Sequence, residues 1–350
     1  MQKVFLGLLV TMVPLSVVSA LLSWSVGLQF TFCCLGIIAL ASYMGRATES
    51  LAIVAGPRIG GLLNATFGNA VELIISIFAI QAGMYQVVLA SLTGSILGNL
   101  LLVGGLSVFV GGVKYKRQTI NKFDARHNSS MLFFSVALAF VIPQVFSMHL
   151  KHAQSMTLSV GISVVLIVMY LAALFFKLVT HRGVYDIKGE EGHEEETAEW
   201  SKKKALLVLI FATLAVAFLS ERLVHTIEDV AHSLGWSELF IGVIIVAIVG
   251  NAAEHASAVV MAYKNKMDVA VEIAVGSTLQ IAMFVVPVLV IVSLFYGSGM
   301  ALVFSLPELV AMIASVFLIS KIVSDGDTNW LEGAMLLGAY IIVGIGFYLI

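Results

Sequence analysis

Long apolar runs dominate the chain and limit what it can fold into. Runs of about 20 apolar residues recur along all 350 residues and end at clusters of Lys, Arg or Gly. About 20 residues of α-helix cross the hydrocarbon core of a bilayer, and only helices or closed barrels satisfy every backbone polar group there. The runs are continuous instead of alternating every second residue, which excludes a transmembrane barrel. We therefore predict an all-α polytopic membrane protein.

A hydropathy window of about 19 residues predicts eleven transmembrane helices. They cover residues 4–23, 28–54, 58–82, 86–112, 128–148, 156–179, 203–225, 238–262, 268–295, 304–323 and 331–350. The first run also resembles a signal peptide, but apolar residues continue into Leu21 and Leu22, so we expect it to remain as a helix. Charged residues make up 11% of the chain, against roughly 25% in soluble domains, which agrees with a membrane protein.

Basic residues predict the orientation, because Lys and Arg accumulate in cytoplasmic connections. With a cytoplasmic N-terminus, sixteen of the nineteen Lys and Arg residues fall inside and only Lys151 falls outside. We expect a plasma-membrane protein with its C-terminus on the opposite side. Segment 180–202, with its glutamates between Glu190 and Glu199, is predicted to be an acidic cytoplasmic linker. A role in collecting or sensing cations is the open alternative.

The chain contains an internal repeat with a polar centre. Shifted by 182 residues, 59–100 aligns with 241–282 without a gap, and 11 of the 42 positions are identical. Gly68-Asn69-Ala70-Val71-Glu72 recurs as Gly250-Asn251-Ala252-Ala253-Glu254, and Gly94-Ser95 recurs as Gly276-Ser277. Five helices per copy make the second copy enter the membrane upside down. We expect an N-terminal helix in 1–27, a first repeat in 28–179, the linker, and an inverted repeat in 203–350.

Glu72 and Glu254 are the candidate functional groups. Inverted repeats bring matching residues together near the membrane midplane, so the two carboxylates should face each other. Each is expected about halfway along an apolar helix, where a charge costs at least ~3 kcal/mol, so a purely structural role is the weaker interpretation. Asn69 and Asn251 lie three residues earlier, on the same helix face. Carboxylate and amide oxygens suit a hard divalent cation, and a set without rigid octahedral geometry favours Ca²⁺ over Mg²⁺.

Other residues around the repeat have two interpretations each. On a helix, His255 points about 100° away from Glu254, which favours a proton or gating group over a metal ligand. Glu49 and Glu221 occupy similar places in the first helix of each repeat and are either gate or proton-path groups or members of interfacial ion pairs. The motif glycines either let backbone carbonyls of a broken helix approach an ion or allow close helix packing; they are Gly68, Gly250, Gly94 and Gly276.

These motifs resemble those of calcium/proton exchangers, the cation/proton branch of the calcium:cation antiporter superfamily. The resemblance rests on the paired Gly-Asn-Ala-x-Glu motifs, the eleven spans and the acidic segment between the sixth and seventh, and it covers essentially the whole chain. Sodium/calcium exchangers carry a Gly-Thr-Ser-x-Pro-Glu type of repeat instead. No Pro precedes Glu72 or Glu254, which favours protons over Na⁺ as the driving ion.

The resemblance also implies site residues and motions. It implies that Glu72 and Glu254 bind Ca²⁺ and protons alternately, with nearby carbonyls and polar side chains completing or supporting the site; these are Asn69, Asn251, Ser95 and Ser277. It further implies five-helix halves that rock or slide against each other. The resemblance also implies that a homo-oligomer is among the expected partners.

The predicted function is a secondary active antiporter that exports cytosolic Ca²⁺ in exchange for protons by alternating access. Two close carboxylates in a poorly solvated site disfavour joint ionisation, so protons and Ca²⁺ compete for the same oxygens. The protein is expected to be a transporter without a cofactor, not an enzyme. Its expected partners are Ca²⁺, protons and the lipid bilayer, and a net charge of -2 argues against nucleic acid.

Three alternatives stay open. A cation channel also uses carboxylates, but it gives no reason for two inverted halves. A Na⁺-coupled cation exchanger would share the fold. An intramembrane metal-dependent hydrolase is less favoured, because the chain has no His-Glu-x-x-His motif.

Overall fold

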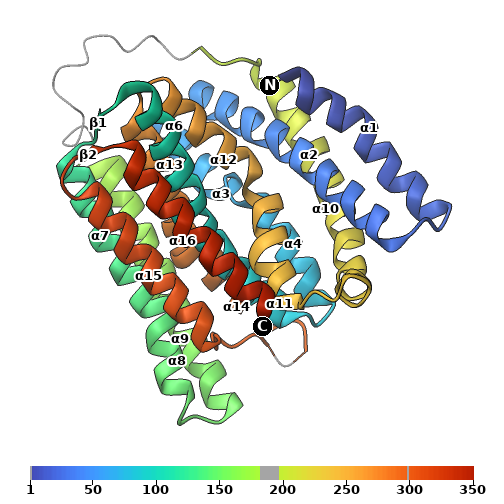
Figure 1. The fold of residues 1–350 in the computed structure, drawn as a ribbon. Coiled ribbons are helices and arrows are strands. Elements are labelled where there is room, and N and C mark those ends of the chain that lie inside the picture. Colours follow the sequence, from blue (N-terminus) through green and yellow to red (C-terminus); the bar gives the residue numbers. More distant parts are fainter. Residues whose placement is uncertain (1, 182–196, 298) are drawn as a thin grey trace.

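The computed structural model describes residues 2–181, 197–297 and 299–350, which are almost entirely helical (Figure 1). The first half contains α-helices and π-helical segments (η): α1 (Gln2–Leu21), α2 (Val26–Ala55), α3 (Pro57–Phe67), α4 (Ala70–Gln81), α5 (Tyr85–Leu97), η1 (Gly98–Val103), α6 (Gly104–Tyr115), α7 (Lys122–Val136), η2 (Ala137–Val141), α8 (Ile142–Ser147), α9 (His152–Phe175) and η3 (Phe176–Thr180). The second half contains α10 (Lys202–Leu234), α11 (Glu238–Phe240), η4 (Ile241–Val246), α12 (Ala247–Tyr263), α13 (Met267–Gln280), η5 (Ile281–Val285), α14 (Val286–Ser293), α15 (Leu306–Val323) and α16 (Trp330–Leu349).

Ten of the described helices are long and apolar enough to cross a membrane, which confirms the prediction of an all-α polytopic membrane protein. The predicted span 58–82 instead consists of two shorter helices, α3 and α4, which are separated at Gly68 and Asn69. At about 1.5 Å per residue, the two together are long enough for one crossing. The described helices are therefore compatible with eleven crossings.

The predicted boundaries hold within a few residues for most spans, but α10 is longer than expected. It continues beyond the predicted end at 225 as far as Leu234, and Gly235 ends it in the left-handed conformation with φ 67°. The extension carries Glu228 and Asp229, which are exposed, and their low hydropathy explains why a hydropathy window stops too early.

Two continuous helical stretches lie at the centre of the molecule. Residues 85–115 (α5, η1 and α6) and 267–293 (α13, η5 and α14) are the most deeply buried of the ten spans, and α1 is the least buried. Around this centre, α2 and α10 pack along each other and α1 packs on α2 (Figure 1). The central position of α5 and α13 matters because each carries a Gly-Ser motif.

A short antiparallel ribbon joins the two halves at one end of the molecule, which we call the ribbon end (Figure 1). Strand β1 (Gln118–Thr119), between α6 and α7, pairs with β2 (Asp327–Thr328), between α15 and α16. Helix α1 begins at the ribbon end, and α16 finishes at the opposite end, which we call the far end. The sequence does not predict these strands, because two residues carry no alternating pattern.

Candidate cation site

Glu72 lies in the first turn of α4, directly after the break that separates α3 from α4. Gly68 ends α3 and Asn69 occupies the N-cap position of α4. A side chain at Gly68 would be crowded, because an added Cβ would lie 2.7 Å from the carbonyl oxygen of Asn64 and 3.3 Å from Oε1 of Glu254. The expectation that Glu72 lies in the middle of a continuous helix is wrong. Its carboxylate lies at a helix N-terminus, where free N–H groups and the helix dipole favour an anion.

Glu254, in contrast, lies within a continuous helix. Segments α11, η4 and α12 follow one another without a gap, so the second copy of the motif does not break its helix. An added Cβ at Gly250 would lie 3.6 Å from Cβ of Glu72. Because Glu254 lies beside Gly68 and Glu72 lies beside Gly250, the two motifs face each other. Glu72 is buried, whereas Glu254 is partly exposed.

One network of polar side chains surrounds Glu72. The hydroxyl of Ser95, on α5, donates a hydrogen bond to Oε1 of Glu72. Nδ2 of Asn251 donates to Oγ of Ser95 at 2.9 Å and to the carbonyl oxygen of Ala247 at 3.0 Å. The carboxylate and hydroxyl of the first repeat are therefore held by the amide of the second.

A second network crosses the repeats in the opposite direction. The hydroxyl of Ser277, on α13, donates to Oδ1 of Asn69 at 3.2 Å. Nδ2 of Asn69 donates to Oε1 of Gln280 at 2.7 Å. An added Cβ at Gly68 would also lie 3.4 Å from Oε1 of Gln280, so this amide oxygen lies beside the same glycine as the carboxylate of Glu254.

Each carboxylate keeps one oxygen without a hydrogen bond. Oε2 of Glu72 and Oε2 of Glu254 are buried and have no hydrogen-bond partner among the described residues. A buried carboxylate oxygen without a partner is costly unless a proton or a cation satisfies it. The described part of the chain offers carboxylate, amide and hydroxyl oxygens here, and no cluster of three His, Cys, Asp or Glu side chains able to hold a metal. This donor set suits a hard cation that also accepts backbone or water oxygens.

The sequence did not identify two polar residues of this region, Gln280 and Asn99. Oδ1 of Asn99 lies 3.2 Å from Nε2 of His255, so the half-buried imidazole is paired with an amide from the other repeat. Gln280 and Asn99 align with Gly98 and Ile281, so the repeat comparison could not reveal them. One signal in the sequence could have identified them: each is an uncharged amide side chain inside an apolar span, three or four residues after a Gly-Ser motif.

Glu49 and Glu221 occupy helices outside these networks. Glu49 is exposed on α2, and Glu221 is exposed on α10. Glu221 lines a cavity of about 420 Å³ together with Arg222, His225 and Asp229. This cavity lies between the first part of α2 and the second part of α10, and its lining includes neither Glu72 nor Glu254.

The motif glycines on α5 and α13 have different surroundings. At Gly94 an added Cβ would lie 1.9 Å from the carbonyl oxygen of Val243, so α5 packs directly on η4. At Gly276 nothing lies within 4 Å of an added Cβ. The counterpart of η4 in the first repeat is α3, whose Gly60 lies against the backbone of Ala52 on α2. The pair α5–η4 is therefore packed closely at its motif glycine, whereas α13 has open space at the matching glycine.

Most of the acidic linker lies outside the described residues, including Glu190, Glu191, Glu194, Glu195 and Glu196. Its last residues are described, and they dock on α2. Glu199 forms an ion pair with Arg46, and Arg46 lies 4.6 Å from the ring centre of Trp200. Trp200 is buried and stacks on Tyr43. The hydrogen bond and charge of Arg46 hold the pKa of Glu199 below its usual range.

Comparisons with known proteins match the whole chain. The family described as "Sodium/calcium exchanger protein" matches residues 24–179 and 204–349. The Ca²⁺/H⁺ antiporter ChaA of Bacillus subtilis (strain 168) is 64% identical over 351 residues, which cover 100% of both chains. The Ca²⁺/H⁺ antiporter of Synechocystis sp. is 46% identical over 364 residues, covering 99% of this chain and 97% of the relative.

Solved structures agree with these matches. The structure of native YfkE superposes with a TM-score of 0.88 at 60% identity, covering 99% of this chain and 100% of that chain. The H⁺/Ca²⁺ exchanger CAX superposes with a TM-score of 0.73 at 14% identity, covering 99% of this chain and 92% of that chain, and shares the fold.

Proposed function

Because the chain belongs to the sodium/calcium exchanger protein family, we propose that it is a secondary active antiporter that exports cytosolic Ca²⁺ in exchange for protons. The observation that carries the proposal is the pair of facing carboxylates, Glu72 and Glu254, each with a buried oxygen that finds no hydrogen-bond partner in the described part of the chain. The names of the similar proteins support this choice of ions, since ChaA is a Ca²⁺/H⁺ antiporter and CAX an H⁺/Ca²⁺ exchanger.

Glu72 and Glu254 bind either Ca²⁺ or protons in this proposal. Two carboxylates that face each other in a poorly solvated site disfavour joint ionisation, so a divalent cation and protons compete for the same oxygens. Asn69, Asn251, Ser95, Ser277 and Gln280 hold the carboxylates in place or supply further oxygens. Exchange becomes obligatory if the empty, doubly charged site cannot change its access side, while the protonated and Ca²⁺-loaded sites can.

The ribbon end is the cytoplasmic end in this proposal. Basic residues flank the connections that meet there: Lys114, Lys116, Arg117, Lys122, Lys264, Lys266 and Lys321. Lys and Arg accumulate in cytoplasmic connections. The N-terminus is then cytoplasmic, and α16 ends on the opposite side of the plasma membrane.

The site opens toward the cytoplasm in this state. Glu254 is partly exposed, and Ser257, one turn closer to the ribbon end on α12, is exposed. The open space beside Gly276 and the close packing at Gly94 support access from the ribbon end and closure toward the far end. A cytosolic Ca²⁺ ion therefore reaches Glu254 before Glu72.

The chain consists of an N-terminal helix and two inverted repeats, with boundaries near 28–179 and 203–350. The two segments of the family match support this division. So do the turns that follow the two motif helices, since Gly83 and Asn265 are 182 residues apart and both have positive φ, 78° and 63°. The π-helical segments η1 and η5 also occupy matching places, three or four residues after Ser95 and Ser277.

Everted membrane vesicles test the proposal directly. When the interior of the vesicles is made acidic, we expect uptake of ⁴⁵Ca²⁺ against its own gradient. This uptake should stop when a protonophore removes the proton gradient, and vesicles with Glu254→Gln should show none. A Na⁺ gradient alone should drive nothing. Uptake driven by Na⁺ would identify a Na⁺-coupled exchanger, and passive flux that only equalises Ca²⁺ would identify a channel.

A further inference from the structure

Three side chains from the first half of the chain hold the last turn of the helix that carries Glu254. Nε2 of Gln118 donates to the carbonyl oxygen of Ala262 at 3.0 Å and to Oδ1 of Asn265 at 2.9 Å. Nζ of Lys114 and the hydroxyl of Tyr115 donate to the carbonyl oxygen of Tyr263 at 3.0 and 3.1 Å. We call this group of contacts the clasp.

The clasp satisfies groups that a helix leaves open. The last carbonyls of a helix have no intrahelical partner, and a cation near them interacts favourably with the helix dipole. The start of the next helix is held as well, because the backbone N–H of Asn121 donates to Oδ1 of Asp268 at 2.6 Å. Both helices of the α12–α13 turn are thus fastened to the first half of the chain.

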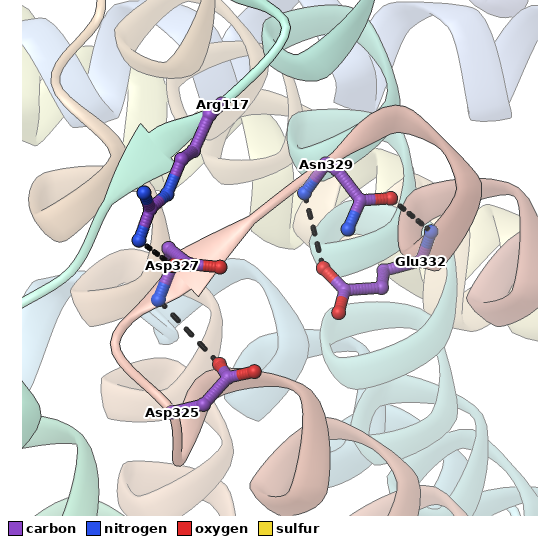
Figure 2. Close-up of polar contacts among 5 residues, drawn as sticks. All are labelled: Arg117, Asp325, Asp327, Asn329 and Glu332. Carbon is purple, nitrogen blue, oxygen red and sulfur yellow. Dashed lines mark hydrogen bonds and ion pairs between the residues drawn. The ribbon is translucent and has the colours of Figure 1, made fainter.

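The β-ribbon fixes the position of Gln118. Gln118 pairs with Thr328 and is 2% exposed. Arg117, beside it, forms an ion pair with Asp327, and Asn329 and Glu332 cap the start of α16 with reciprocal hydrogen bonds (Figure 2). Gly111 provides the space for the Gln118 amide, because an added Cβ there would lie 1.8 Å from Oε1 of Gln118. A buried glutamine held in this way has little freedom to move.

The far end has a related but lighter arrangement around the helix of Glu72. Nε2 of Gln81 donates to the hydroxyl of Tyr296 at 3.1 Å, and the hydroxyl of Tyr85 donates to the carbonyl oxygen of Tyr296 at 2.6 Å. Tyr296 and Lys114 are 182 residues apart, as are Gln81 and Tyr263. Among the described residues, the strand pair occurs only at the ribbon end. The turn after Glu254 is therefore held more firmly than the turn after Glu72.

We propose that the clasp positions the carboxylate of Glu254 and that Gln118 is a positioning residue of the cation site. The inference rests on the proposed function. Glu254 lies two turns before Ala262 on an unbroken helix, and a helix transmits a shift of its end to side chains two turns away. The clasp stays closed during transport, so the ribbon end of α12 does not rock away from the first half.

Gln118→Leu keeps a side chain of similar size and removes both donated hydrogen bonds. Gly111→Ala keeps the glutamine at position 118, but its new methyl group displaces the side-chain amide of Gln118. Both variants should raise the Ca²⁺ half-saturation measured from the ribbon end about tenfold, because the carboxylate of Glu254 is no longer held in place, with the maximal rate within about twofold of wild type. The matched control is Gln154→Leu, which removes a glutamine hydrogen bond to the backbone N–H of Lys151 at the far end, on a helix that carries no residue of the site, and it should leave this half-saturation unchanged.

A cross-link tests the closed clasp independently of these variants. The backbone N–H of Asn121, at the start of α7, donates to the carboxylate of Asp268, in the first turn of α13, so cysteines at these two positions lie within the reach of a short bis-methanethiosulfonate reagent. Asn121→Cys with Asp268→Cys, in a background of Cys33→Ala and Cys34→Ala, should exchange at the same rate before and after the reagent joins the α12–α13 turn to the first half of the chain.

The outcomes separate this inference from the proposed function. If the wild-type protein showed no proton-driven uptake of Ca²⁺, the proposed function would be contradicted. With wild-type exchange intact, a fall in maximal rate at unchanged half-saturation in Gln118→Leu and Gly111→Ala would overturn the positioning role. Exchange that stops on cross-linking and returns on reduction would show that the α12–α13 turn moves away from the first half, and would overturn the inference even if the other variants fail to insert.

Discussion

At the scale of single residues, matching side chains of the two repeats have different surroundings. Glu72 is buried at a helix N-terminus and accepts a hydrogen bond from Ser95, whereas Glu254 is partly exposed within a continuous helix. The repeat predicts that the two carboxylates meet, and the structure places their motifs opposite each other. The difference between the two could not be predicted, because the motifs differ only at Val71 and Ala253, and tertiary packing decides the surroundings of each carboxylate.

Neutralising either carboxylate should abolish exchange. Glu72→Gln and Glu254→Gln keep the side-chain volume and remove the charge, so each should insert normally and retain less than about 5% of the wild-type ⁴⁵Ca²⁺ uptake, a loss of roughly 2 kcal/mol or more in transport. Glu238→Gln, an exposed acid at the start of α11, is the matched control and should exchange normally. A rate above half of wild type in either motif variant would remove that carboxylate from the mechanism.

At the scale of helices and their contacts, the close approach of α5 to η4 contrasts with the space beside α13. The sequence has a glycine at both places, Gly94 and Gly276. It does not predict which of these glycines contacts a neighbouring helix, because that contact depends on where α3 lies. Gln280 and Asn99 escaped prediction for a related reason, since they break the symmetry that the motifs follow.

The two glycines should respond differently to a methyl group. The methyl group of Gly94→Ala pushes α5 away from η4. Overpacking of this kind lowers the free energy of unfolding by roughly 1–3 kcal/mol, so the apparent Tm should fall by several degrees. Gly276→Ala should leave the apparent Tm unchanged. It should nevertheless slow exchange at least tenfold, because inversion of the repeats predicts that α13 closes on α3 in the opposite state. Thermal unfolding of both purified variants and their uptake rates check these expectations. If Gly276→Ala exchanged at the wild-type rate, the predicted closure of α13 on α3 would be contradicted.

The contact between the end of the linker and α2 should depend on pH. Because the pKa of Glu199 is lowered, its ion pair with Arg46 adds stability at neutral pH that is lost as the pH falls through the lowered pKa. The Glu199 side chain is 44% exposed, so screening limits the contribution to less than about 1 kcal/mol. Glu199→Gln should lower the apparent Tm slightly at pH 7 and by less at an acidic pH below about 4, where protonation of Glu199 begins to remove the ion pair. Equal Tm differences at both pH values would contradict this assignment.

At the scale of the whole molecule, the proposed orientation predicts which surface each connection reaches. Lys266 is exposed at the ribbon end, and Lys151 is exposed at the start of α9, at the far end. With Cys33 and Cys34, both buried, replaced by Ala, Lys266→Cys should react with an impermeant maleimide only in everted vesicles. Lys151→Cys should react only in right-side-out vesicles. The reverse pattern would place the ribbon end outside the cell.

Hydropathy predicts most of the architecture, because each segment that crosses the hydrocarbon core of a bilayer must be long and apolar. The class, most span boundaries and the meeting of the two motifs follow from length, composition and the repeat. The ribbon and the helix break do not, since two-residue strands and a local break leave no periodic pattern. Both lie where the first half of the chain contacts the second, and contacts between distant segments are what a single sequence shows least.

The stack of Trp200 on Tyr43 beneath Arg46 has a spectroscopic consequence. An indole that is buried against an aromatic ring and a guanidinium emits at a different wavelength and intensity from one in water. With Trp24, Trp236 and Trp330 replaced by Phe, the fluorescence of Trp200 reports whether the start of α10 stays against α2. The protein therefore contains its own optical probe for the movement of these two helices while ions cross.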